Sequence, residues 1–263
     1  MKKKLLLAIC LASLCLNAAP AMADPFGADG GARLQSVLDN ITKGPNPGDS
    51  SVDVTTDMLP DDKAAGSPYD SYWSITGTGG SFATLVFKVT ESGYETLGDF
   101  GIYDYADPTK TVQLFEGDSV TPGSQATVTI KTDGSVYTLG GTHDTGIDFG
   151  GNLFGYYFDT ENLCAAGGGF WHSDSALNGG QDHMYAYQGT NTDTVQLPGL
   201  APGTWTPNEY ILAWECGNLS SADKDYDDLV VMVESVEPIP VPGAVLLGLL
   251  GLTAAGVKLR RFA

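Results

Sequence analysis

Residues 125–139 carry the sequence QATVTIKTDGSVYTL, and this stretch decides the fold. Ala126, Val128 and Ile130 alternate with polar residues, a period of two that is typical of a strand with one buried face. The segment TDG at 132–134 then interrupts the alternation with a typical hairpin turn, in which glycine supplies the positive φ. A second strand over residues 135–139 follows it. The stretch therefore predicts an antiparallel β-hairpin.

The same pattern recurs through residues 71–236. Ala83, Leu85 and Phe87 again alternate with polar side chains. Further short strands are predicted at 99–105, 111–116, 153–159, 182–188, 209–215 and 229–236. Because long helices do not alternate with these strands, the body is predicted to be all-β, an antiparallel β-sandwich or a jelly roll.

One short helix is expected before this body, within residues 24–70. Its apolar residues follow the spacing i, i+3, i+4, i+7: Leu34, Val37, Leu38 and Ile41. This spacing places them on one face of a helix. Residues 44–70 are rich in Gly, Pro, Asp and Ser, which predicts an ordered loop or an extended cover.

The composition limits the possible partners. The chain has 263 residues, of which 42% are hydrophobic, so it can bury a core. Its 32 acidic and 13 basic residues give a net charge of −19. Three basic residues lie near each end, and without these six the interior holds seven basic residues against 32 acidic ones, a charge of −25. Nucleic acid is therefore not an expected partner, since phosphate binding needs clustered Lys and Arg.

The N-terminus has the organisation of a secretory signal peptide over residues 1–23. A basic start at 2–4 precedes an apolar run at 5–16, and small residues close the segment at Ala21 and Ala23. We expect export through the Sec translocon and cleavage after Ala23.

The C-terminal segment 237–263 has three parts. A Pro-rich stretch at 238–243 precedes the uncharged apolar run 244–257, and basic residues close the chain. This order predicts a C-terminal hydrophobic helix that acts as a transient inner-membrane anchor, with its basic end in the cytoplasm. An ordinary C-terminal membrane anchor is the alternative.

This tail resembles the PEP-CTERM sorting signal of exopolysaccharide-producing Gram-negative bacteria. The resemblance implies recognition by an exosortase, a membrane cysteine protease or transpeptidase, near Pro240, Val241 and Pro242. Val241 stands where the family motif has Glu. A protein sorted in this way is expected at the cell surface or in the extracellular matrix.

Two cysteines remain after the signal peptide is removed, Cys164 and Cys216. An even pair in an exported chain predicts a disulfide, which would close a loop of 52 residues. Two isolated cysteines without a partner histidine make a zinc site or a catalytic thiol an unfavoured interpretation.

Carboxylates concentrate at Glu215 and in the loop ADKDYDDL at 222–229. Such a concentration repels itself, and Lys224 is the only basic residue nearby in the sequence. A hard cation such as Ca²⁺ would relieve the repulsion with six to eight oxygen contacts. A solvated acidic turn is the alternative.

An EF-hand is excluded for this loop. Asp223, Asp225 and Asp227 imitate the first three ligand positions of that motif. However, Asp228 stands where the motif requires glycine, and the residues that follow predict a strand instead of a helix. A calcium site would therefore have to be built on a loop between two strands.

The region 150–236 resembles a bacterial surface module called domain of unknown function 4114. The similar stretches are 168–174, 177–184 and 225–231, which contain an Asp-His pair and a closing element of the Asp-Tyr-Asn-Asp type. Asp227 replaces the usual Asn, and Cys216 stands where an acidic residue is common. Carried over by position, the resemblance implies these metal ligands: Asp182, Glu215, Asp223, Asp225 and Asp228.

Signals for catalysis are weak. His172, Ser173 and Asp174 are triad residue types, but neighbours on a strand point to opposite faces and cannot form a relay. We therefore expect a protein that is not an enzyme, a calcium-stabilised structural or adhesive component of the extracellular polysaccharide layer of a biofilm. A carbohydrate-binding module using Trp73 or Trp171 is one alternative. A hydrolase, which needs two carboxylates facing each other across a cleft, is the other.

Overall fold

The computed structural model describes residues 26–44, 48–60, 70–77, 81–87, 98–117, 120–161 and 164–239. The predicted signal peptide with Ala23, the predicted sorting residues Pro240, Val241 and Pro242, and the apolar run 244–257 lie outside the described residues. Within the described part of the chain, no helix is both long and apolar enough to cross a membrane.

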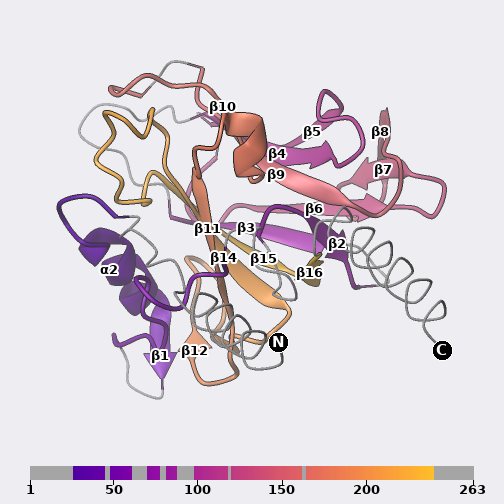
Figure 1. Cartoon of the computed structure of the whole chain (residues 1–263). Helices are drawn as coiled ribbons and strands as arrows, with labels where there is room; N and C mark the ends of the chain where they lie inside the picture. The colour runs from indigo at the N-terminus through magenta and orange to yellow at the C-terminus, as the bar shows by residue number, and fades with distance from the viewer. Residues whose placement is uncertain are drawn as a thin grey trace, which may run out of the picture.

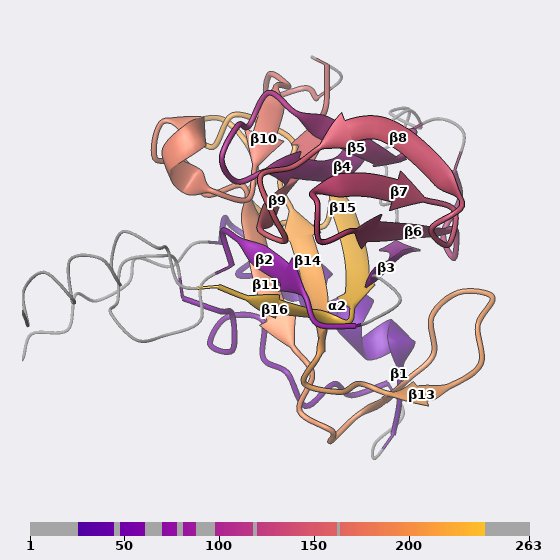
Figure 2. The ribbon, with the colours of Figure 1, turned by 90° about the vertical axis from the view of Figure 1, so that its right-hand side faces the viewer.

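Two antiparallel sheets form the body, seen from two directions 90° apart in Figures 1 and 2. In spatial order, the seven-stranded sheet contains β11 (Met184–Gln188), β14 (Glu209–Trp214), β15 (Leu229–Glu234), β3 (Ser81–Phe87), β6 (Gln125–Ile130), β7 (Ser135–Thr138) and β8 (His143–Asp148). The six-stranded sheet contains β16 (Val236–Pro238), β2 (Trp73–Ile75), β9 (Phe154–Asp159), β4 (Asp99–Asp104) and β5 (Thr111–Phe115), with β10 (Phe170–His172) paired to β9.

A continuous aromatic and aliphatic core lies between the two sheets. Trp73 of one sheet packs against Tyr210 of the other with ring centroids 4.9 Å apart, and Phe100 packs against Trp214 at 6.2 Å. All four side chains are buried. The fold is an all-β sandwich, as the sequence predicts.

The predicted hairpin is present. β6 and β7 pair antiparallel with Ile130 opposite Val136, and Gly134 in the turn has φ of 92°. The predicted strand 229–236 is wrong at its end, because Ser235 takes a left-handed conformation with φ of 61°. This turn moves the chain from β15 in the seven-stranded sheet to β16 in the six-stranded sheet.

The N-terminal segment covers the outer face of the seven-stranded sheet. The helix α2 (Ala32–Ile41) buries the four apolar residues that the spacing predicts, and these pack with side chains of β11, β14 and β15. A small sheet of β1 (Thr42–Gly44), β12 (Thr194–Val195) and β13 (Gly203–Thr204) extends this layer. The seven-stranded sheet therefore has a second core on its outer face.

The region 150–236 is not a separate unit within the body. Its strand β15 pairs with β3, and its strand β9 pairs with β4, both from earlier in the chain.

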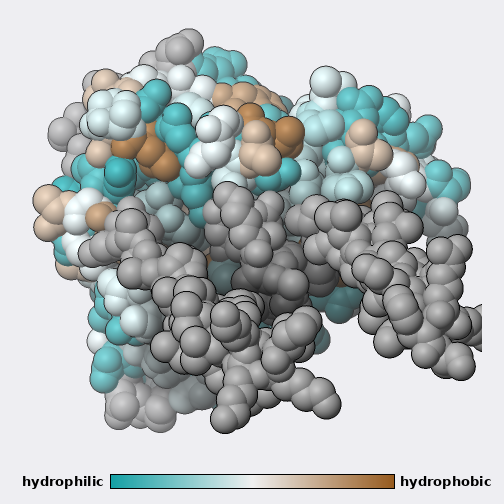
Figure 3. All heavy atoms as spheres, in the orientation of Figure 1, coloured by the Kyte–Doolittle hydropathy of each residue, from teal (hydrophilic) through white to brown (hydrophobic). Residues whose placement is uncertain are grey.

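A 3₁₀ turn, η1 (Ser175–Asn178), follows β10. The exposed large hydrophobic residues in the described part are Leu139, Phe170 and Leu177. On the face drawn in Figure 3, the hydrophobic areas are small and separated by hydrophilic ones.

Candidate functional site

The register of two strands brings the predicted acidic residues together. β14 and β15 pair antiparallel with Trp214 opposite Leu229, so Glu215 and Asp228 lie next to each other just beyond the paired residues. The residues between them form a loop that closes over this end of the sheet. The sequence predicts both strands, and their pairing in the structure builds the base of the site.

Potential metal ligands gather in two groups that share Glu215. One group contains Glu215, Asp223 and Asp225, and the other contains Glu215, Cys216 and Asp228. Within each group the ligand atoms lie within 4.8 Å of one another. Four of the five carboxylates implied by the resemblance are thus brought together.

Asp182 does not belong to either group in the described residues. Its Oδ1 accepts a hydrogen bond from the Met184 backbone N–H at 3.3 Å, and its carbonyl oxygen accepts one from the Tyr226 hydroxyl at 2.9 Å. The backbone of Asp182 therefore holds the acidic loop in place, while its carboxylate is engaged with the start of β11.

Several carboxylates of this region are buried, whereas Asp223 is exposed. Glu215, Asp225 and Asp227 are 1%, 3% and 4% exposed. Burial, reinforced by the charge of Asp228, raises the pKa of Glu215 to about 9. Burial and the neighbouring Asp225 raise the pKa of Asp227 to about 8, and burial raises that of Asp228 to about 6. The protein thus holds several carboxylates where their charged forms are unfavourable.

One oxygen of this cluster lacks a donor. Glu215 Oε1 accepts a hydrogen bond from the Gly217 backbone N–H at 3.3 Å. Glu215 Oε2 is fully buried and has no hydrogen-bond partner among the described residues. A buried polar atom without a partner costs about 1–3 kcal/mol and requires an explanation. A hard cation is a suitable partner, because carboxylate oxygens are its preferred ligands.

A positive charge reaches the cluster from the N-terminal helix. Arg33 Nη1 donates to Asp225 Oδ2 at 2.7 Å and lies 4.0 Å from Asp223 Oδ2. The prediction counted Lys224 as the only basic residue near these carboxylates. It was incomplete, because Arg33 lies 192 positions away from Asp225 in the sequence. The Gly27 backbone N–H also donates to the Lys224 carbonyl at 3.1 Å. The N-terminal segment is therefore anchored on the acidic loop.

A disulfide borders the cluster. Cys164 and Cys216 are joined, with Cα atoms 6.0 Å apart and 52 positions between them. Closing a loop of that length contributes about 4 kcal/mol on the loop-entropy model. The Cys216 backbone N–H donates to Asp228 Oδ2 at 2.8 Å. Since its sulfur is oxidised, Cys216 supports the site without providing a thiolate ligand.

The triad residue types have structural contacts. Ser173 Oγ donates to the Ser71 carbonyl at 2.6 Å. Asp174 Oδ2 accepts a hydrogen bond from the Tyr72 hydroxyl at 2.5 Å, while its Oδ1 caps η1 through the Ala176 backbone N–H. His172 Nδ1 lies 3.4 Å from the side-chain oxygen of Asn178. These separate hydrogen-bond partners do not join His172, Ser173 and Asp174 into a relay.

Three of the four tryptophans are buried, namely Trp73, Trp205 and Trp214. Trp171 is half-buried, its ring is stacked on His183 with centroids 3.7 Å apart, and its Nε1 donates to the Cys216 carbonyl at 2.6 Å. The prediction that Trp73 could offer a sugar-binding face is wrong, and one face of the Trp171 ring is covered.

No family model, curated protein or solved structure matches the chain. The resemblances to the PEP-CTERM sorting signal and to domain of unknown function 4114 therefore stay predictions.

Proposed function

We propose that the protein is an exported, non-enzymatic component of the bacterial surface or extracellular matrix, with an all-β body completed by Ca²⁺. The observation that carries this proposal is the buried oxygen Glu215 Oε2, which has no hydrogen-bond partner among the described residues and belongs to a carboxylate grouped with those of Asp223, Asp225 and Asp228. Such an arrangement costs stability when the site contains no cation, and a bound cation removes that cost.

The ligands proposed for the ion are Glu215, Asp223, Asp225 and Asp228. They lie at one end of the β14–β15 pair. Asp223 and Asp225 belong to the loop between these strands, whose backbone carbonyls can supply further ligands. Calcium accepts six to eight oxygen ligands in irregular geometry, which suits a loop site better than the strict octahedron of magnesium. Bound Ca²⁺ would also favour the charged forms of the carboxylates and so lower their pKa values.

The proposed location is supported by the predicted signal peptide, by the predicted C-terminal sorting segment and by the disulfide. Disulfides persist in oxidising compartments outside the cytoplasm, and Cys164 and Cys216 are placed to form one. After export, the segment 237–263 would hold the protein at the inner membrane until an exosortase acts near Pro240 to Pro242. Divalent cations could then bridge the acidic surface to anionic extracellular polysaccharide.

The test is thermal unfolding of the oxidised protein in Ca²⁺ and in excess chelator. A ligand that binds the folded state alone stabilises it by mass action, by about 2.7 kcal/mol at a concentration 100 times Kd. We expect a higher midpoint in Ca²⁺, and we expect Glu215→Gln to abolish the increase. Glu161→Gln, at an exposed position, is the matched control. An unchanged midpoint at millimolar Ca²⁺ would contradict the proposal.

A further inference from the structure

Cys216 connects the acidic cluster to the Gly-rich segment 164–169. It directly follows Glu215 in the chain, and its backbone N–H donates to Asp228 Oδ2 at 2.8 Å. Its sulfur is joined to that of Cys164, the first residue of the segment. Two of the proposed calcium ligands are thus tied to the disulfide, one through the chain and one through a hydrogen bond.

Further contacts hold the Gly-rich segment against the start of the loop that carries the acidic residues. The Asn218 backbone N–H donates to the Gly167 carbonyl at 3.1 Å, and the Ser221 hydroxyl donates to the Ala166 carbonyl at 3.2 Å. The packing is close, because a Cβ atom added to Gly217 would lie 2.6 Å from the Cβ of Ala166. The segment therefore forms a wall along this part of the loop.

The carbonyl of Cys216 has a partner on the same side. Trp171 Nε1 donates to it at 2.6 Å. Trp171 lies in β10, the strand that follows the Gly-rich segment, and its ring is stacked on His183. The N–H, the carbonyl and the sulfur of Cys216 are all engaged, so the position of the adjacent Glu215 is fixed from three directions.

The disulfide is the one covalent link between the segment and the loop. Residues 167–169 are three consecutive glycines, and Gly167 takes a left-handed conformation with φ of 89°. Glycine loses more conformational freedom on ordering than any other residue. Breaking the S–S bond would therefore release a segment that is costly to order, and the constraint on Cys216 would loosen with it.

We propose that the oxidation state of this disulfide sets the calcium affinity of the acidic cluster, so that the protein binds calcium tightly only after oxidation. This inference rests on the proposed function, because it concerns the same ion. Reduction by a dithiol breaks the S–S bond and adds two electrons and two protons, which leaves Cys164 and Cys216 as thiols and the dithiol as a cyclic disulfide. An exported chain would then gain its ion in the oxidising compartment.

The first test is calorimetric titration of calcium into the full chain, once oxidised and once reduced with dithiothreitol. Near-UV circular dichroism reports whether the reduced chain stays folded. We expect reduction to weaken calcium binding roughly 10-fold, an ordinary size for coupling between linked sites. Equal affinity of the two forms would overturn this inference and leave the proposed function intact. An oxidised chain that binds no calcium would overturn both.

The reciprocal measurement follows the disulfide in place of the ion. Coupling between two equilibria acts equally in both directions. In buffers of oxidised and reduced dithiothreitol, saturating calcium should therefore lower the equilibrium constant for reduction by the factor found in the titration. A disulfide reduced equally well with calcium and with chelator would overturn the inference.

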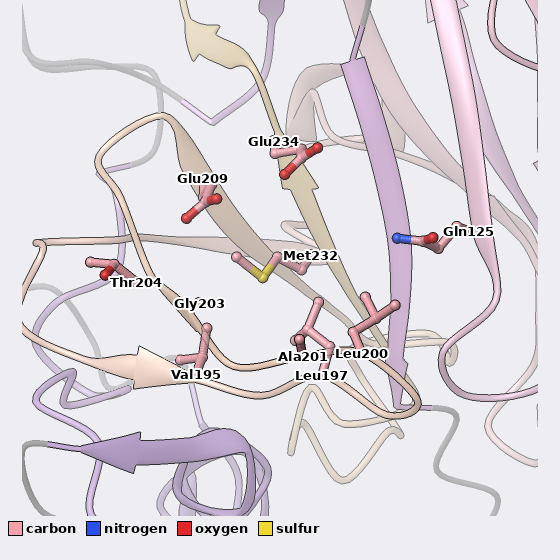
Figure 4. A pocket seen from close by; sticks show the side chains of 10 residues that line it. All are labelled: Gln125, Val195, Leu197, Leu200, Ala201, Gly203, Thr204, Glu209, Met232 and Glu234. Atoms are coloured by element: carbon pink, nitrogen blue, oxygen red, sulfur yellow. The ribbon is translucent and has the colours of Figure 1, made fainter.

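Two control variants separate the disulfide from general stability and from general charge. Val136→Ala opens a cavity at a buried position of β7, with β3 and β6 between it and β15. Glu209→Gln removes a carboxylate at the other end of β14, roughly 20 Å from Glu215. There Glu209 is paired with Glu234, and both line the pocket drawn in Figure 4. Both variants should bind calcium like the wild type when oxidised, and a 10-fold loss in either would overturn the inference.

Trp171→Phe tests the same constraint without breaking the disulfide, and so without the risk that the reduced chain unfolds. The variant keeps an aromatic ring but removes the hydrogen bond to the Cys216 carbonyl. In the oxidised chain we expect calcium binding to weaken several-fold, as for the loss of one hydrogen bond. Unchanged binding would overturn the proposed constraint on Cys216.

Discussion

The acidic residues of the hairpin and loop turns differ sharply from those of the cluster around Glu215. In the turns, each aspartate accepts hydrogen bonds from the backbone and the hydroxyl of a Ser or Thr two positions later. Three aspartates share this arrangement and have lowered pKa values: Asp53, Asp107 and Asp133. In the cluster, Glu215 and Asp227 have raised pKa values because burial removes them from water.

The difference comes from the supply of donors and water, since the residue types are the same. A turn aspartate is stable as an anion because its own loop provides the donors. A cluster carboxylate shares its surroundings with other carboxylates, and among the described residues the cation that forms ion pairs with them is Arg33. The acidic composition therefore has two physical roles, and only the cluster has a reason to bind a cation.

The largest expected effect that sharpens this comparison is a pH dependence in the absence of calcium. A carboxylate with a raised folded pKa contributes stability that is complete below its unfolded pKa and is lost as pH rises through the folded value. For Glu215 and Asp227 this window runs from about pH 4 to pH 9. We expect the free energy of unfolding to fall across this window, by an amount on the order of several kcal/mol.

Urea unfolding at several pH values in chelator measures this decrease, and the same series in saturating Ca²⁺ is the comparison. With the ion bound, the decrease should largely disappear, because the cation favours the charged carboxylates. Glu215→Gln in chelator should make the decrease smaller and leave the part that comes from Asp227. A profile that is equally flat with and without Ca²⁺ in the wild-type protein would remove the distinction between the two groups of acids.

A smaller effect is expected from Arg33→Gln, which removes the ion pair with the buried Asp225. In chelator the variant should lose about 1–2 kcal/mol of stability, because a buried carboxylate loses its counter-charge. This loss is smaller than that expected for a fully buried ion pair, because the Arg33 side chain is 47% exposed and water screens its charge. In calcium titrations the variant should bind the ion several-fold more tightly, since a competing cation is gone. Arg33→Lys is the control, and weaker calcium binding by Arg33→Gln would contradict this view of Arg33 as a competitor.

Much of the fold, and the acidic residues of the candidate site, could be predicted from the sequence. Alternation identified the hairpin of β6 and β7. The strands predicted at 209–215 and 229–236 placed the acidic loop between two strands, and their pairing in the structure brings Glu215 and Asp228 together. β8 was missed because its sequence HDTGID has no apolar alternation, and it extends the sheet by pairing alone.

Other parts of the site depended on contacts that no local pattern encodes. Arg33 reaches Asp225 through the packing of α2 on the sheet, and the sequence places these two residues 192 positions apart. The pairing of Glu209 with Glu234 was missed for a similar reason. Glu209 and Glu234 become partners through strand register, and the wall that covers them comes from a turn-rich loop at 195–204.

The smallest expected effect belongs to the turns and has the opposite dependence on pH. Asp133→Ala removes the acceptor for the Ser135 backbone and hydroxyl groups, so the variant should be slightly less stable than the wild type at neutral pH. A lowered folded pKa contributes stability that is present above the unfolded pKa and is lost as pH falls through the folded value. The difference between Asp133→Ala and wild type should therefore vanish in acid, below about pH 3, and should be the same in Ca²⁺ and in chelator. Paired urea curves at pH 7 and at pH 2.5 measure both properties. If calcium changed the difference, the turn aspartates would share in cation binding, and the separation of the acids into two groups would fail.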